Sequence, residues 1–302
     1  MLDLDFAFFN LINRDKQGLF YQKGVLDRLT PIFFSPRVKN LIELPDLNCQ
    51  GCNIVLPLGQ ANMQVLESSK QHLLFQRSYE VARDFQLQAM AVDRRLKDLL
   101  MEPEEGFSLV FGDNFIKALA YAIIKRSLSS RDISKLILVG EISGLAEFVE
   151  AVSDLNVPVS IQNPYPSRYE IMTYRLMYEK GNAVSNSQIN PHKWERGNLV
   201  IIFDSRYNNL SIAIPDVMLL KLTDESQGLA KELELELSSK EVSPLLCNLA
   251  PIMETCLLAQ EGFLTRCSEQ SMLIKEDRLS FRRLEELGNK ADIWHLFLDK
   301  VA

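Results

Sequence analysis

The chain has 302 residues, a formal net charge of −7 and 47% hydrophobic residues. This length is typical of two domains rather than of one hydrophobic core. The acidic balance argues against a protein that holds nucleic acid on a basic face. The sequence has no apolar run of about 18 residues, so we expect no membrane span.

The N-terminal segment MLDLDFAFFNLINRDK carries acidic residues where a secretory signal carries basic ones. Most of the five cysteines lie in apolar surroundings, as expected of reduced thiols. Cys49 and Cys52 have C-x-x-C spacing, which leaves a redox pair open, but no second pair completes a zinc site. We therefore expect a cytoplasmic protein without a metal site, and a homodimer is one alternative for its assembly.

Residues 1–112 are expected to form an N-terminal α/β domain. Short apolar runs predict strands over 6–12, 53–58 and 109–111, and apolar residues at helical spacing predict a helix over 66–90. Asp113 then lies at the N-cap position of a helix whose apolar stripe continues to Ser127. This helix could connect the two domains.

Residues 113–250 are expected to form a Rossmann-like nucleotide-binding domain. Helices predicted over 145–155 and 167–179 alternate with strands predicted over 136–139, 157–161, 183–185, 199–203 and 217–222. Such alternation implies a parallel sheet, because parallel strands need a crossover connection. A helix over 225–238 follows, and residues 251–302 are expected to form C-terminal helices over 251–262 and 276–300, with a break at Gly288.

The segment LILVGEISGLA, residues 136–146, carries the main binding hypothesis. A strand ends at Gly140, and a helix begins after Gly144, so the backbone could approach a phosphate at the helix N-terminus. Gly140, Ser143 and Gly144 are the candidate phosphate-binding residues. Glu141 would repel a phosphate unless it points away, and the G-x-G-x-x-G pattern is incomplete. An ordinary strand-to-helix turn therefore stays open as the alternative.

Further candidate cofactor contacts follow the later strands. A dinucleotide site usually has an acid at the end of the second strand, but here the strand ends in Gln162 and Asn163. Asn163 is nevertheless a candidate contact. Arg168 could meet a 2′-phosphate, which would favour NADP over NAD, and a plain surface arginine is the alternative. Asp204 follows the fourth strand, on the carboxyl edge where ligands bind in open α/β sheets.

Several segments resemble the shikimate-dehydrogenase-like oxidoreductases, namely GCNIVLPLG at 51–59, GDNFIKAL at 112–119 and the turn at 140–144. Three more resemble a branch of long-chain acyl-carrier-protein reductases, namely APIMETCLLAQEG at 250–262, IKEDRL at 274–279 and LEELGNK at 284–290. The resemblance implies an N-terminal α/β domain, a Rossmann domain that takes NADP or NAD, and C-terminal helices that pack back toward the interdomain cleft.

The departures from these families bear on catalysis. The resemblance maps the shikimate-type aspartate onto Asp113, which could also merely cap its helix, and it maps the partner lysine onto Gly59. The acyl reductase cysteine maps onto Pro251, and Cys247, four residues upstream, is expected to be a small buried residue. The sequence therefore predicts an NAD(P)-binding, oxidoreductase-like protein with degenerate catalytic residues. A non-catalytic nucleotide or metabolite binder, or a structural relative, is the alternative.

Overall fold

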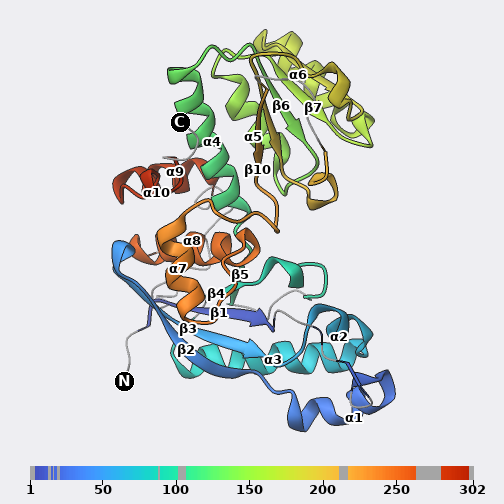
Figure 1. Ribbon diagram of the computed structural model, residues 1–302, viewed down its shortest axis with the longest axis vertical. Helices are drawn as coiled ribbons and strands as arrows, with labels where there is room; N and C mark the ends of the chain where they lie inside the picture. Colours follow the sequence, from blue (N-terminus) through green and yellow to red (C-terminus); the bar gives the residue numbers. More distant parts are fainter. Residues whose placement is uncertain are drawn as a thin grey trace. The chain divides into compact units, whose positions relative to one another are not determined.

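The computed structural model describes residues 4–12, 15, 17–18, 21–87, 89–100, 107–210, 217–262 and 280–298. The chain divides into two compact units (Figure 1). The first unit contains residues 1–115 and 230–293, and the second contains residues 116–229 and 294–302. The boundary expected at residue 112 lies close to the first division. The boundary expected at residue 250 instead falls inside a helix of the first unit.

The first unit is built on a five-stranded sheet with the strand order β2-β3-β1-β4-β5. Strand β2 is antiparallel to β3, and the other pairs are parallel. The strands are β1 (Phe6–Leu11), β2 (Arg37–Leu44), β3 (Cys49–Leu56), β4 (Ala89–Val92) and β5 (Ser108–Val110). The three strands predicted in this region are confirmed, whereas β2 and β4 were not predicted.

Three helices pack on one face of this sheet, namely α1 (Lys23–Phe33), α2 (Gln60–Val65) and α3 (Ser68–Asp84). Helix α3 buries Leu74, Phe75, Tyr79 and Ala82, which recur on one side of the helix and share a core with the strands. The predicted helix over 66–90 is too long at its C-terminal end, because β4 begins at Ala89.

The opposite face of the sheet is covered by α8 (Leu246–Gln260), which contacts β1, β3, β4 and β5 (Figure 1). The helix is buried nearly all round, as expected from its apolar composition. The same unit contains α7 (Lys231–Ser239) and α9 (Phe281–Lys290), whereas α10 (His295–Leu298) is grouped with the second unit. The break predicted at Gly288 is wrong, because Gly288 lies inside α9. The segment 274–279 lies outside the described residues.

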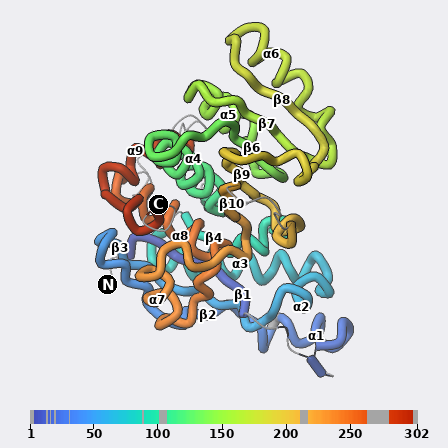
Figure 2. Tube along the Cα trace, turned by 45° about the horizontal axis from the view of Figure 1, so that its top comes forward, coloured from blue at the N-terminus to red at the C-terminus, as the bar shows by residue number. Residues whose placement is uncertain are grey.

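The second unit has five strands, all parallel, in the order β10-β9-β6-β7-β8. Figure 2 shows the strand labels in this sequence. The strands are β6 (Lys135–Val139), β7 (Val159–Gln162), β8 (Val184–Ser187), β9 (Asn198–Ile202) and β10 (Met218–Lys221). Counted along the unit, this is the order 3-2-1-4-5 of a doubly wound Rossmann-like sheet. The predicted α/β fold class is therefore confirmed.

Helix α5 packs on one face of this sheet, and a cluster of side chains around Trp194 packs on the other. The helices of this part are α4 (Asp113–Ser130), α5 (Leu145–Ser153) and α6 (Glu170–Lys180). Phe148 of α5 packs edge-on against Phe203, with 5.7 Å between the ring centroids. The other face carries a core cluster around the fully buried Trp194. No helix in the described parts of either unit is long and apolar enough to cross a membrane.

Candidate functional site

The turn after β6 requires glycine at both of its ends. Gly140 has a φ of +90°, and a Cβ added there would lie 2.6 Å from Cβ of Asp204. Gly144, the N-cap of α5, has a φ of +69°. Side chains are strained at such φ angles, so both positions favour glycine. Ser143 and Gly144 are exposed at the start of the helix, where the first N–H groups lack intrahelical partners.

This turn lies at the point where the strand order of the sheet reverses. The connection from β6 leads to β7 on one side, and the connection from β9 leads to β10 on the other. The two strand ends remain joined, because Phe203 donates its N–H to the carbonyl of Val139 at 3.0 Å. Ligands of open α/β sheets bind outside the carboxyl ends of the strands at such a switch point. The sequence therefore placed Gly140, Gly144 and Asp204 at the appropriate edge.

Lys117 of α4 also lies beside this turn, although the sequence patterns did not point to it. It is only 3% exposed, and its Nζ lies 2.6 Å from the position of a Cβ added to Gly144. It forms an ion pair with the half-exposed Glu147, whose Oε2 is 3.9 Å from its Nζ. A buried ammonium beside the first turn of α5 adds positive charge to that of the helix N-terminus. The signal in the sequence was a lone charge within the apolar stripe of α4.

Glu141, which the sequence marked as an obstacle to phosphate, is held by other groups. Its Oε1 accepts a hydrogen bond from Nδ2 of Asn163 at 3.0 Å and from Nη1 of Arg168 at 2.9 Å. Arg168 also lies over the ring of Tyr165, 5.0 Å from its centroid. Two of the candidate cofactor contacts, Asn163 and Arg168, are therefore brought together on a carboxylate of this chain.

Asp204, the remaining candidate at this edge, has its carboxylate occupied by Arg206. The guanidinium donates from Nε to both carboxylate oxygens, at 3.1 and 2.9 Å, and the N–H of Arg206 donates to Oδ1 at 2.9 Å. Asp204 therefore shapes the turn after β9 and contacts Gly140. It lines the site with a neutralised carboxylate rather than with a free acid.

In the first unit, Asp113 forms ion pairs instead of capping its helix. Its Oδ1 accepts a hydrogen bond from Nη1 of Arg94 at 2.7 Å, and its Oδ2 accepts one from Nζ of Lys97. Burial acts to raise the pKa of Asp113, but the charges of Arg94 and Lys97 outweigh it and hold this pKa below its ordinary value. Lys97 is 38% exposed in its side chain. A lysine–aspartate pair is therefore present, although the sequence motif lacked the lysine.

The N-terminus of α4 is capped by a side chain from another helix. Glu254 of α8, only 6% exposed, accepts a hydrogen bond from the N–H of Phe115 at 2.9 Å. Gly112 allows this approach, because a Cβ there would lie 2.5 Å from the backbone N of Pro251. The expectation that Asp113 caps the helix is therefore wrong, and the acid of the 250–262 segment performs that role.

The other motif positions carry no reactive group. A Cβ added to Gly59 would lie 2.7 Å from Cα of Asp15, so a lysine does not fit there. Cys247 lies inside α8 and is 1% exposed, as expected of a structural cysteine. Cys49 and Cys52 are three residues apart within β3 and so project from opposite faces, which excludes a redox pair between them. The four described cysteines are all free thiols.

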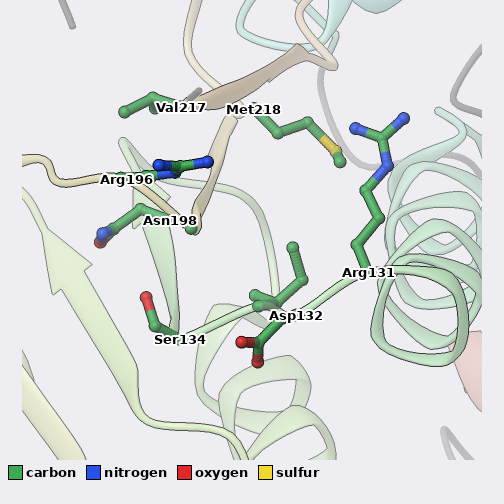
Figure 3. Close-up of a pocket in the computed structure, with 9 residues that line it drawn as sticks. Arg131, Asp132, Ser134, Arg196, Asn198, Val217 and Met218 are labelled. Atoms are coloured by element: carbon green, nitrogen blue, oxygen red, sulfur yellow. The ribbon is translucent and has the colours of Figure 1, made fainter. Parts of the chain in front are cut away.

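A pocket of about 640 Å³ lies at the other edge of the second sheet (Figure 3). It is lined at the amino ends of β6, β9 and β10 by Arg131, Asp132, Ile133, Ser134, Arg196, Gly197, Asn198, Val217 and Met218. In Figure 3 the side chains of Arg131 and Arg196 extend from separate segments, with Met218 between them. Because ligands of such sheets bind at the carboxyl edge, we do not assign the nucleotide to this pocket.

No family model matches the sequence, and no curated protein is similar to it. Among solved structures, L-tryptophan dehydrogenase from Nostoc punctiforme is similar over 98% of this chain and 82% of that chain, at 10% identity and a TM-score of 0.42. Shikimate 5-dehydrogenase from Listeria monocytogenes, in complex with shikimate and NAD, is similar over 85% of this chain and 90% of that chain, at 9% identity and a TM-score of 0.32.

A third structure, ligand-free 5-ketofructose reductase of Gluconobacter sp. strain CHM43, is similar over 93% of this chain and 98% of that chain, at 10% identity and a TM-score of 0.31. All three TM-scores are below 0.5, so these structures are not evidence of this chain's function. The Rossmann-like fold rests instead on the strand order and strand directions of the second unit.

Proposed function

We propose that the chain is an oxidoreductase that binds a nicotinamide dinucleotide, NADP or NAD, at the carboxyl edge of the second unit's sheet. The observation that carries the proposal is the coincidence of the glycine turn with the switch point between β6 and β9. The nucleotide is a small-molecule partner, and the proposal requires neither nucleic acid nor a membrane. The resemblance to acyl-carrier-protein reductases remains a hypothesis about the substrate class.

The residues of the turn fit a pyrophosphate. Gly140 and Gly144 have positive φ angles and present no Cβ, so the backbone can approach a ligand closely. Lys117 provides a charge that is already desolvated and held next to α5. The carboxylate of Asp204 is paired with Arg206, which reduces its repulsion of a phosphate. The carboxylate of Glu141 is bound by Asn163 and Arg168, which follow β7, and is therefore directed toward the end of that strand. Ser143, exposed at the turn, can contribute its hydroxyl.

The bound dinucleotide would supply the hydride chemistry, and the chain's own residues must supply proton transfer. Asp113 and Lys97 form the candidate pair, because an ammonium and a carboxylate in direct contact can hold and move a proton. Arg94 keeps Asp113 ionised and oriented. In this proposal Lys97 exchanges the proton with the substrate, and Asp113 positions its ammonium.

A non-catalytic nucleotide or metabolite binder is the second candidate. It is favoured by the absence of a reactive group at Gly59 and at Pro251, the two positions that the motifs would assign to chemistry. A panel of acyl thioesters and hydroxy acids, followed by nicotinamide absorbance, separates the two candidates. Turnover that is lost in Lys97→Met, with nucleotide binding retained, supports the enzyme. Binding without turnover of any substrate supports the second candidate.

The first test is the thermal unfolding midpoint with and without NAD, NADP, NADH and NADPH. A ligand at about 100 times its Kd stabilises the folded state by about 2.7 kcal/mol, which is readily measured. Lys117→Met should weaken binding by about 10- to 100-fold, because a hydrogen bond to a charged group contributes about 1.5–3 kcal/mol. Gly144→Asp should abolish binding by adding a carboxylate beside Lys117.

Lys125→Met is the matched control for Lys117→Met, because Lys125 is an exposed lysine on the same helix. It should bind the dinucleotide as the unaltered protein does. The absence of any shift at millimolar concentrations of all four dinucleotides would refute the proposal. Equal weakening by Lys117→Met and Lys125→Met would instead refute the role of the buried ammonium.

A further inference from the structure

The end of β7 lacks the acid that usually recognises an adenosine ribose, and its amides are already engaged. Oε1 of Gln162 accepts hydrogen bonds from Nε1 of Trp194 at 3.0 Å and from the N–H of Asn190 at 3.2 Å. Oδ1 of Asn163 accepts one from the N–H of Tyr165 at 2.8 Å. Both amides are nearly fully buried. Neither Gln162 nor Asn163 therefore offers a free acceptor to a ribose diol.

A carboxylate nevertheless lies at the end of β7, supplied by the turn after the neighbouring strand. Glu141 reaches the buried Asn163, which donates to its Oε1. Arg168 donates to the same oxygen. Within the part of the chain that the structure describes, Oε2 of Glu141 accepts no hydrogen bond, and the side chain is 37% exposed. One carboxylate oxygen is thus fixed, and the other remains open to a ligand.

We propose that Glu141 is the residue that selects NAD over NADP, by accepting hydrogen bonds from the hydroxyls of the adenosine ribose. The inference rests on the proposed function, because it concerns the same dinucleotide site. A carboxylate only accepts hydrogen bonds, so it complements a diol that donates them. A 2′-phosphate at the same place would put two negative groups in contact, which disfavours binding.

Arg168 opposes this selection in principle, because a guanidinium complements a phosphate. Its side chain is 60% exposed, and its charge is already shared with Oε1 of Glu141. To meet a 2′-phosphate, Arg168 would have to leave a carboxylate that the buried Asn163 holds in place. Glu141 is therefore the fixed group and Arg168 the movable one, so Glu141 determines the preference for NAD over NADP.

The test compares ADP-ribose with its 2′-phosphorylated analogue by isothermal titration calorimetry, which needs no turnover. The unaltered protein should bind ADP-ribose at least about 10-fold more tightly. Glu141→Gln, which keeps the side-chain shape and an acceptor for Asn163, should reduce this ratio about 10-fold or more, mainly through tighter binding of the phosphorylated analogue. Glu141→Ala should also reduce the ratio, and circular dichroism should show that both variants remain folded.

Glu150→Gln is the charge-matched control, because it removes one acid from the same unit where Glu150 pairs with Arg175 and Lys180. The affinity ratio should not change in this variant. A preference of the unaltered protein for the phosphorylated analogue would overturn the inference, and so would an unchanged ratio in Glu141→Gln. Binding of neither compound by any variant would refute the dinucleotide site itself, which distinguishes the two failures.

Discussion

Replacing Gly140 by alanine tests the close approach between the ends of β6 and β9. The added Cβ would lie 2.6 Å from Cβ of Asp204 and 3.2 Å from its backbone N. Carbon atoms pack at about 3.5–4.0 Å, so about 1 Å of movement is needed. Asp204 cannot easily move this far, because the N–H of the preceding Phe203 is hydrogen-bonded to the carbonyl of Val139. The carboxylate of Asp204 also accepts a hydrogen bond from Arg206.

The expected destabilisation has two parts. The φ of +90° strains an alanine by about 1–2 kcal/mol. The contact with Asp204 adds about 1–3 kcal/mol, which is the usual cost of overpacking a tight site. Gly181→Ala is the matched control, because Gly181 has a φ of +70° and no atom within 4 Å of an added Cβ. Gly140→Ala should therefore lower the free energy of unfolding by about 1–3 kcal/mol more than Gly181→Ala does.

The assay is urea unfolding followed by the fluorescence of Trp194, which is fully buried in the core of the second unit. A Trp294→Phe background removes the only other tryptophan. The variants should differ in midpoint and not in slope, since the slope reports the surface exposed on unfolding. A difference between the two variants below about 0.5 kcal/mol, the scale of a neutral surface substitution, would refute the close approach.

Three further predictions concern the first unit. Asp113→Asn should lower the melting temperature more at pH 7 than at pH 3. The pKa of Asp113 is depressed in the folded state, so its carboxylate stabilises the fold above its unfolded pKa of about 4, and this stabilisation is lost as the pH falls. Cys52, whose pKa is raised to about 11 by burial, should be labelled by a thiol reagent only as the protein unfolds, as measured by peptide mass mapping. Glu254→Ala should cost about 1–2 kcal/mol in urea unfolding by removing the cap on Phe115, and Glu254→Gln should cost less because it keeps an acceptor.

The fold of the second unit was predictable because its strands are buried on both faces. Such strands appear as continuous apolar runs, as in Leu136 to Val139 and Leu199 to Ile202. The strand β2 escaped prediction for the opposite reason. It is an antiparallel edge strand with exposed residues at its start, and its sequence RVKNLIEL mixes charged and apolar positions.

The two glycines of the turn were predictable, but the lysines Lys97 of the first unit and Lys117 of the second were not. A glycine at a strand end signals a backbone requirement that is local in the chain, as at Gly140 and Gly144. Lys97 and Lys117 acquire their roles from tertiary packing, which joins each of them to a residue on another element. The local sequence gave only weak signals for either, namely a basic run after β4 and a charge in an apolar stripe.

The geometry of parallel sheets explains why a residue missing from a sequence motif can be replaced by one from elsewhere in the chain. Their strands end at a common edge, so a group needed there can come from the end of any strand rather than from one sequence position. In our proposal for the first unit, Lys97 after β4, which contacts Asp113, takes the place of the lysine missing at Gly59 after β3. In our proposal for the second unit, Glu141 after β6 takes the place of the acid missing after β7. An incomplete motif is therefore poor evidence for an inactive site, and the chemistry of this chain must be judged from the side chains that meet at each edge.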